Sequence, residues 1–292
     1  MTKKEQTEEK KNEVVTTKST SLSAGFSQYA GAGAENITRD DIKMPHLKII
    51  EGGSDYVKQG SDDYIDEAKV GDIINTATKE LYTNKTDGVL IIPVINKKLF
   101  TEWAPRGSEE STGRPVAYHE LPPADAKEVE VSTEIGTKKV LKRENGNEIV
   151  ETQYYFVIIL DKDNNPIPGI IDMSSTRLSS ARELNTCIYN YTQKGLPAFA
   201  AIIKLKTVFK QKGGKSWNIY TVSKVKEHAL LKDGFLDIEG SAKELFEYTA
   251  NQYNIALKDK NFFINVATTD SDNQGEGKKG SDTKSEAVKG IL

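Results

Sequence analysis

The sequence predicts a mainly β fold of the α+β type: a small closed or partly open β-barrel with long loops, one internal helix and one C-terminal helix. Most apolar segments alternate in character or are rich in β-branched residues, which is typical of strands. Two segments instead have apolar residues at helical spacing. Because strands and helices do not alternate along the chain, we do not expect a doubly wound nucleotide-binding fold.

One folded domain is expected at residues 37–266, between disordered tails at 1–36 and 267–292. Both tails are polar and have few large apolar side chains, so they cannot bury enough surface to offset the entropy of the chain. The N-terminus lacks the apolar stretch of a secretory signal. No apolar run approaches the roughly 18 residues of a membrane helix, so we expect a cytosolic protein without a membrane partner.

Strands are predicted in three stretches of the folded domain, at residues 87–100, 138–173 and 196–225. Pro93 in the first stretch indicates an edge strand or a bulge, because proline cannot donate a backbone hydrogen bond. Asn145-Gly146 and "DKDNNP" are typical turns between strands of the second stretch. Residues 104–130 are rich in Pro, Gly and Glu and predict a long loop.

The internal helix is predicted at residues 174–195 and the C-terminal helix at 240–259, from apolar residues spaced three and four apart. The second helix opens with Ser241-x-x-Glu244, a capping-box pattern. Cys187 in the internal helix is the one cysteine of the chain, so no internal disulfide can form. We interpret this thiol as a small core residue.

Gly-Gly-Lys-Ser at residues 213–216 looks like the end of a nucleotide-binding P-loop, but its context contradicts that function. A P-loop has another glycine five residues before Gly214 and continues into a helix. Here that position is Phe209, and the "WNIYTVSKV" that follows is typical of a strand. No helix N-terminus is available to hold a nucleotide phosphate, so we interpret the stretch as the tip of a hairpin.

The predicted hairpin has an apolar face and a face lined with lysines. In its first arm, Lys204, Lys206 and Lys210 alternate with apolar residues. In its second arm, we place Tyr220 on the face with the lysines. We place Trp217 on the apolar face unless the tip of the hairpin projects from the body.

The charge of this region differs from that of the rest of the chain. Residues 184–226 contain eight lysines and no Asp or Glu, so the remainder has a net charge of −11 against −3 for the whole protein. A basic element in an acidic chain is typical of a protein that binds a phosphate backbone. Lysines that protect a sheet edge from aggregation are the alternative explanation.

Lysines neutralise phosphates and exposed rings stack on unpaired bases, so both residue types are candidates for contact with a nucleic acid strand. A second basic and aromatic cluster, "NKKLFTEWAPRG", follows the first predicted strand, and Arg114 extends it. We interpret Arg177 and Arg182 as residues that flank the core. The candidate binding residues are Lys97, Lys98, Trp103, Arg106, Lys204, Lys206, Lys210, Lys212, Lys215, Trp217, Tyr220 and Lys224.

Motifs of catalytic and metal sites are absent from the sequence. There is no G-x-S-x-G elbow and no H-E-x-x-H pair, and the three histidines are not spaced as metal ligands. We interpret the acid-rich stretch "SDDYIDE" as solvated surface. No enzymatic activity, no cofactor and no metal are expected.

Several segments occur in a characteristic order over residues 30–258: "AGAGAENITRDDIKMPHLKIIEGGS", "GVLIIPVINKKLFTEWAPRG", "IIDMSSTRLSSARELNT" and "KSWNIYTVSKV". In this order the chain resembles the single-stranded DNA-binding proteins of tailed bacteriophages. The resemblance implies an OB-like barrel that coats single strands in phage replication, recombination and repair, without catalysis. It also implies binding roles for Lys97, Trp103, Arg106, Lys204, Lys206, Trp217 and Tyr220.

These observations predict a sequence-tolerant single-stranded DNA-binding protein in the cytoplasm of the infected bacterial host. Phage replication proteins, such as a polymerase, helicase or primase, are further expected partners. Two alternatives stay open: a virion or assembly protein whose hairpin binds another protein, and an annealing recombinase or a nuclease with an unrecognised metal site. Monomer and homodimer are equally compatible with the sequence.

Overall fold

The computed structural model describes residues 44–83, 87–105, 107–108, 111, 115–133 and 136–273. All of them belong to the second of two compact units, residues 43–292. The predicted N-terminal tail, Arg106 and Arg114 lie outside the described residues.

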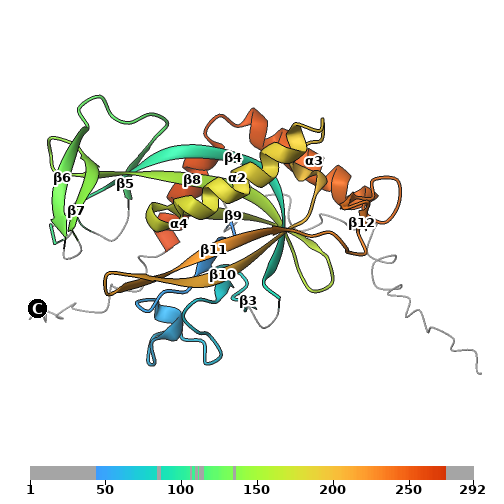
Figure 1. The fold of residues 1–292 in the computed structure, drawn as a ribbon, viewed down its shortest axis with the longest axis horizontal. Coiled ribbons are helices and arrows are strands. Elements are labelled where there is room, and N and C mark those ends of the chain that lie inside the picture. Colours follow the sequence, from blue (N-terminus) through green and yellow to red (C-terminus); the bar gives the residue numbers. More distant parts are fainter. Residues whose placement is uncertain are drawn as a thin grey trace, which may run out of the picture. The chain divides into compact units, whose positions relative to one another are not determined.

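The largest element is an antiparallel sheet with the order β11-β10-β4-β8-β7-β6, in which β5 also pairs with β4 and β9 with β8 (Figure 1). Its strands are β4 (Val89–Trp103), β5 (Pro115–His119), β6 (Lys127–Thr133), β7 (Gly136–Lys142), β8 (Glu148–Leu160), β9 (Pro166–Ser174), β10 (Ile203–Lys212) and β11 (Lys215–Lys224). The prediction of a mainly β protein is confirmed. The predicted loop at 104–130 differs, because it contains β5 and the start of β6.

The centre of the sheet is formed by the long strands β4 and β8. Their ladder runs from Leu90 opposite Leu160 to Trp103 opposite Glu148, with a shift in register between Pro93 and Ile95. Pro93 therefore marks a bulge in a central strand, one of its two predicted settings, where a missing backbone donor is tolerated.

Strand β8 is buried on both faces, which explains the uninterrupted apolar run "YYFVIIL". Tyr155, Val157 and Ile159 point into one core cluster, and the intervening Phe156 and Ile158 point into another. A strand that is covered on both faces needs no polar alternation.

Helices cover the two faces of the sheet. Helix α2 (Leu178–Thr192) contributes Ala181 and Leu184 to the first core cluster, and the hydroxyl of Tyr155 donates to the Ala181 carbonyl over 3.0 Å. The second cluster is covered by α3 (Lys243–Lys258) and α4 (Phe262–Asn273). Short 3-10 turns are η3 (Asp55–Val57), η5 (Ser175–Arg177) and η6 (Ala198–Ala200).

The ends of the C-terminal helices differ from those expected from the sequence. Helix α3 begins at Lys243 without a side-chain cap, because Ala242 and not Ser241 occupies the N-cap position. The Ser241 hydroxyl instead donates to the carbonyl of Ala229 over 2.7 Å. Helix α4 continues past residue 266, the predicted end of the folded domain, and buries Phe262.

A small sheet packs beside the large one and is formed by β1 (Leu47–Ile49), β2 (Ile73–Asn75) and β3 (Leu81–Tyr82); β12 (Leu231–Lys232) and β13 (Phe235–Leu236) form a further pair. An isolated parallel bridge joins His46 to Ile170 of β9. On the other side, side chains rather than a ladder connect the hairpin to this region: Tyr220 donates to the carbonyl of Leu47 in β1, and Thr207 to that of Gly71 in the loop before β2. The described strands therefore form no closed barrel, and the OB-like fold stays a prediction.

Candidate nucleic-acid interface

The β10–β11 hairpin is the predicted binding element, and its register is unbroken. Lys212 pairs with Lys215 at the tip, and Ile203 pairs with Lys224 at the base. Gly213 and Gly214 form the connecting turn at φ 57° and 77°, conformations that glycine adopts without strain. Every residue from 209 to 216 is exposed, so the end of the hairpin extends beyond the packed body (Figure 1).

The register decides which side chains share a face, because residues directly opposite each other in an antiparallel pair point to the same side. Lys210 is opposite Trp217, Lys206 opposite Thr221 and Lys204 opposite Ser223. We call the side of the hairpin that carries Lys204, Lys206, Lys210, Lys212, Lys215, Trp217, Thr221 and Ser223 the lysine face. The prediction that Trp217 lies on the apolar face is therefore wrong, and its ring is half-buried beside Lys210.

Tyr220 does not lie on the lysine face. It is opposite Thr207, only 1% exposed, and its hydroxyl donates to the Leu47 carbonyl over 3.0 Å. Burial raises the pKa of its hydroxyl. A ring that is packed in the core cannot stack on a base, so the predicted contact of Tyr220 with nucleic acid is wrong.

The lysines at the base of the lysine face have an acidic partner that the composition of the hairpin does not reveal. The carboxylate of Asp87 forms ion pairs with both Lys204 and Lys206, the latter at 2.6 Å. Hydrogen bonds from Lys204 and then Lys206 lower the pKa of Asp87 to about 2. Asp87 precedes β4 and lies far outside residues 184–226, the stretch without Asp or Glu. A count of charges within that stretch could not have found it.

The lysines at the tip differ from those at the base. Lys210 and Lys212 are exposed and have no acidic partner in the part of the chain that the structure describes. Phe209 lies on the opposite face of the same tip and is 60% exposed. The sequence pattern assigns Phe209 to the apolar face, and its exposure follows from the extension of the tip beyond the core.

Lys224 lies on the face opposite the lysine face, near the base of the hairpin. Its ammonium group is 3.9 Å from the ring centroid of Phe235 and 5.2 Å from that of Tyr191. Burial and the charges of Lys194 and Lys226 lower the pKa of Lys224. The structure therefore places Lys224 on an aromatic surface, apart from the other hairpin lysines.

The second predicted cluster lies on β4, beyond the short stretch of this strand that pairs with β10. Lys97 forms an ion pair with Glu120, and the ammonium of Lys98 lies 5.4 Å from the ring centroid of Phe100. Trp103 is 36% exposed. Since β10 pairs with β4 only at Val89–Ile91, the ladder does not place this cluster beside the hairpin lysines.

Next to Trp103, the buried Glu102 is held by several donors. Asn147 donates to it over 2.6 Å, Arg143 over 3.1 Å, and His119 Nε2 lies 2.8 Å away. Burial raises the pKa of Glu102, but these contacts outweigh it and keep the pKa below its usual range. This part of β4 is therefore organised around internal polar contacts.

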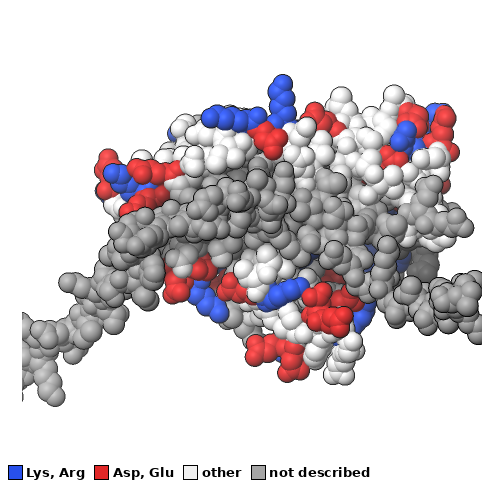
Figure 2. All heavy atoms as spheres, turned by 180° about the vertical axis from the view of Figure 1, so that it is seen from behind, with Lys and Arg blue, Asp and Glu red and all other residues white. Residues whose placement is uncertain are grey.

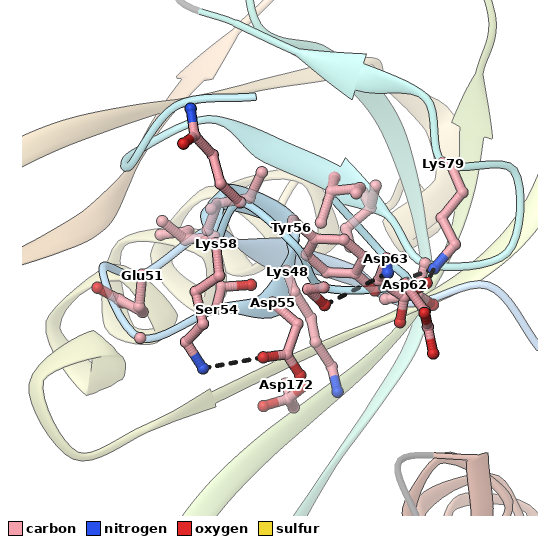
Figure 3. A pocket seen from close by; sticks show the side chains of 18 of the residues that line it. Lys48, Glu51, Ser54, Asp55, Tyr56, Lys58, Asp62, Asp63, Lys79 and Asp172 are labelled. Carbon is pink, nitrogen blue, oxygen red and sulfur yellow. Dashed lines mark hydrogen bonds and ion pairs between the residues drawn. The ribbon is translucent and has the colours of Figure 1, made fainter. Parts of the chain in front are cut away.

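A cavity of about 940 Å³ lies between β1, the loop that follows it and the end of β9 (Figure 3). Its rim carries residues 61–63, the start of the acid-rich stretch that the sequence suggested was solvated surface. Lys58 pairs with Asp55 at 2.9 Å, Lys79 with Asp63 at 2.8 Å, and Arg177 with Glu51. These rim cations are neutralised within the protein, so the cavity is a poor site for a polyanion.

On the side of the molecule shown in Figure 2, the described Lys and Arg side chains are interspersed with Asp and Glu. Among the described residues, no group of three His, Cys, Asp or Glu side chains could hold a metal ion. None of their helices is both long and apolar enough to cross a membrane.

Comparison with known proteins identifies a family but no individual relative. The chain matches none of the curated proteins and none of the solved structures. The model of one family of phage proteins, described as "Pam3 phage gp34-like protein", matches residues 7–261. This match covers most of the 292 residues, and the chain therefore belongs to the Pam3 phage gp34-like protein family.

Proposed function

We propose that this phage protein binds single-stranded DNA, without sequence preference, through the exposed end of the β10–β11 hairpin. The observation that carries the proposal lies at the end of the hairpin: two lysines have no acidic partner among the described residues, and beside them are two aromatic rings, Phe209 exposed and Trp217 half-buried. Lys210 and Lys212 supply charge for phosphates, and Trp217 and Phe209 supply surfaces for bases.

The placement of the rings favours a single strand over a duplex. Trp217 lies directly opposite Lys210 on the lysine face, so a ring and a cation lie side by side. Stacking of this kind needs bases that are not already stacked in a helix, and it tolerates every base because each has a π-face. An interface of lysines and rings therefore fits an unpaired strand of any sequence.

This function fits a role in phage DNA replication, recombination and repair in the cytoplasm of the infected host, where exposed strands need protection. We propose no catalytic step for the protein. An acidic protein partner of the hairpin and an annealing activity are the competing functions, and both are distinguishable by titration and by mixing complementary strands.

The proposal is tested by fluorescence anisotropy with labelled oligo-dT at several salt concentrations. We expect salt-dependent binding of the full chain. The double variant Lys210→Gln plus Lys212→Gln is expected to bind at least about tenfold more weakly, because it removes two charge-assisted contacts. The slope of log K against log salt should fall by about 1.4, since each phosphate contact on a single strand contributes about 0.7.

A matched control lies on a second exposed hairpin of the sheet, formed by β6 and β7. Lys138 and Lys139 of β7 are also neighbouring exposed lysines, but they pair with Glu148 at 3.5 Å and Glu128 at 2.7 Å. Lys138→Gln plus Lys139→Gln changes the net charge equally and should leave affinity within about twofold, because surface pairs contribute little. Absence of binding at low salt, or equal losses in the two double variants, would contradict the proposal.

A further inference from the structure

The base of the lysine face carries a second group of cations, whose partner is an acid from the turn before β4. Asp87 Oδ2 contacts the ammonium of Lys204, and Oδ1 lies 2.6 Å from that of Lys206. Each oxygen of the carboxylate thus contacts the ammonium of one lysine. The two non-bridging oxygens of a phosphodiester present the same pair of acceptors to the same donors.

The surroundings of this ion pair contain further donors for a phosphate. Ser223 is directly opposite Lys204 and Thr221 directly opposite Lys206, and both hydroxyl residues are exposed. Serine and threonine hydroxyls are common phosphate contacts. Burial and the charge of Lys204 lower the pKa of His228. The imidazole is therefore close enough to Lys204 to be affected by its charge.

Asp87 is held at this position by the backbone and not only by its charge. Asp87 and Gly88 have φ values of 73° and 79°, and Val89 then pairs with Leu205 of β10. A Cβ atom on Gly88 would lie 2.2 Å from the Leu205 carbonyl oxygen. The close approach at Gly88 therefore fixes the residue before it against the lysine face.

We infer that Lys204, Lys206, Thr221 and Ser223 form a second phosphodiester-binding site, in which the Asp87 carboxylate occupies the position of the phosphate in the free protein. This inference rests on the proposed function. Because the carboxylate reduces the charge of the lysine pair, Asp87 weakens binding at the base and leaves the tip as the primary contact. A bound strand has to displace Asp87 to reach the second site.

The substitution Asp87→Asn tests this site, because asparagine keeps the shape and tolerates positive φ. We expect the variant to bind oligo-dT roughly fivefold more tightly, because the one negative charge that competes for both lysines is removed. The slope of log K against log salt should become steeper by up to about 1.4, because two more phosphate contacts form. Since the pKa of Asp87 is about 2, the carboxylate is charged at neutral pH and the gain should be constant from pH 5 to 8.

Asp55 offers a matched control, because its side chain is 65% exposed against 64% for Asp87 and it pairs with Lys58 on the cavity rim. Asp55→Asn changes the net charge equally and should leave binding unchanged. Adding Lys204→Gln and Lys206→Gln to Asp87→Asn should abolish the gain. A melting temperature close to that of the wild type shows that each variant is folded.

The outcomes separate this inference from the function on which it rests. If the wild-type protein does not bind oligo-dT, the proposed function fails. If it binds and Asp87→Asn has the same affinity and slope, or binds more weakly, the second site is refuted. If Asp55→Asn gains as much as Asp87→Asn, the gain reflects overall charge and the second site is refuted as well.

Discussion

The tip of the β10–β11 hairpin and the rim of the cavity contain similar residues but use them differently. Both combine lysines, aromatic rings and glycines in exposed chain segments. At the rim, Lys58 and Lys79 have acidic partners within 2.9 Å, whereas Lys210 and Lys212 at the tip have none in the described part of the chain. The comparison teaches that ion pairing, and not the density of lysines, distinguishes the tip from the rim, and the proposed function rests on this difference.

The origin of the acids explains this difference. Asp55 and Asp63 lie in the chain segment that lines the rim, so the rim itself supplies the acidic partners of Lys58 and Lys79. The tip lies in a stretch of 43 residues without an acid, and only a distant segment could supply one. Asp87 is brought next to the base of the hairpin by the pairing of β10 with β4. That ladder ends at Leu205, before the tip.

The largest expected effect concerns this junction. Gly88→Ala should destabilise the protein by about 2–4 kcal/mol, because the new Cβ would meet the Leu205 carbonyl oxygen at 2.2 Å in a strained conformation. Urea denaturation measures the loss. Gly53→Ala in the cavity loop is the control, since nothing lies within 4 Å of its Cβ position, and it should change stability by less than about 1 kcal/mol. A small effect at Gly88 would show that the junction is adaptable.

A smaller effect is expected from the rings of the two regions. Trp217→Ala should weaken binding of oligo-dT by about 1–3 kcal/mol through lost stacking. Tyr56 at the cavity is the control for Trp217. Its ring centroid lies 4.7 Å from the ammonium of Lys79. Tyr56→Ala should leave the anisotropy titration unchanged. Equal losses in both variants would remove the distinction between the tip and the rim.

The smallest effect is expected for an ion pair on the rim. A double-mutant cycle with Glu51→Gln and Arg177→Gln should give a coupling free energy of unfolding below about 1 kcal/mol, because both side chains are partly exposed. Affinity for oligo-dT should not change. A marked loss of affinity in Arg177→Gln would instead extend the binding surface to the cavity.

The local structure was largely predictable from the sequence. Turns at Asn145-Gly146 and at residues 161–165 join the predicted strands, and the internal helix lies within its predicted limits as α2. These features depend on residues that are close in the chain. The sequence predicted a closed or partly open barrel, and the described strands form no closed one. The arrangement of β1 to β3 depends on contacts between distant segments, which no local pattern predicts.

The faces of the hairpin were only partly predicted, although the decisive signal was present. Alternation defined two faces for each arm but did not say which faces match. A two-residue turn at Gly213-Gly214 makes Lys212 the partner of Lys215, and counting outwards places Trp217 opposite Lys210 and Tyr220 opposite Thr207. By contrast, no local pattern predicts that Asp87 reaches Lys204, since that contact follows from the pairing of β10 with β4.

The two side-chain hydrogen bonds at Thr207 and Tyr220 have a mechanical consequence. These residues are directly opposite each other in the register, and they hold the hairpin to β1 and to the loop before β2. Both bonds hold the base of the hairpin to the packed body, whereas residues 209–216 are exposed. We therefore expect amide hydrogens of residues 209–216 to exchange with solvent far faster than those near Leu205, which would let the tip follow a flexible strand without disturbing the fold.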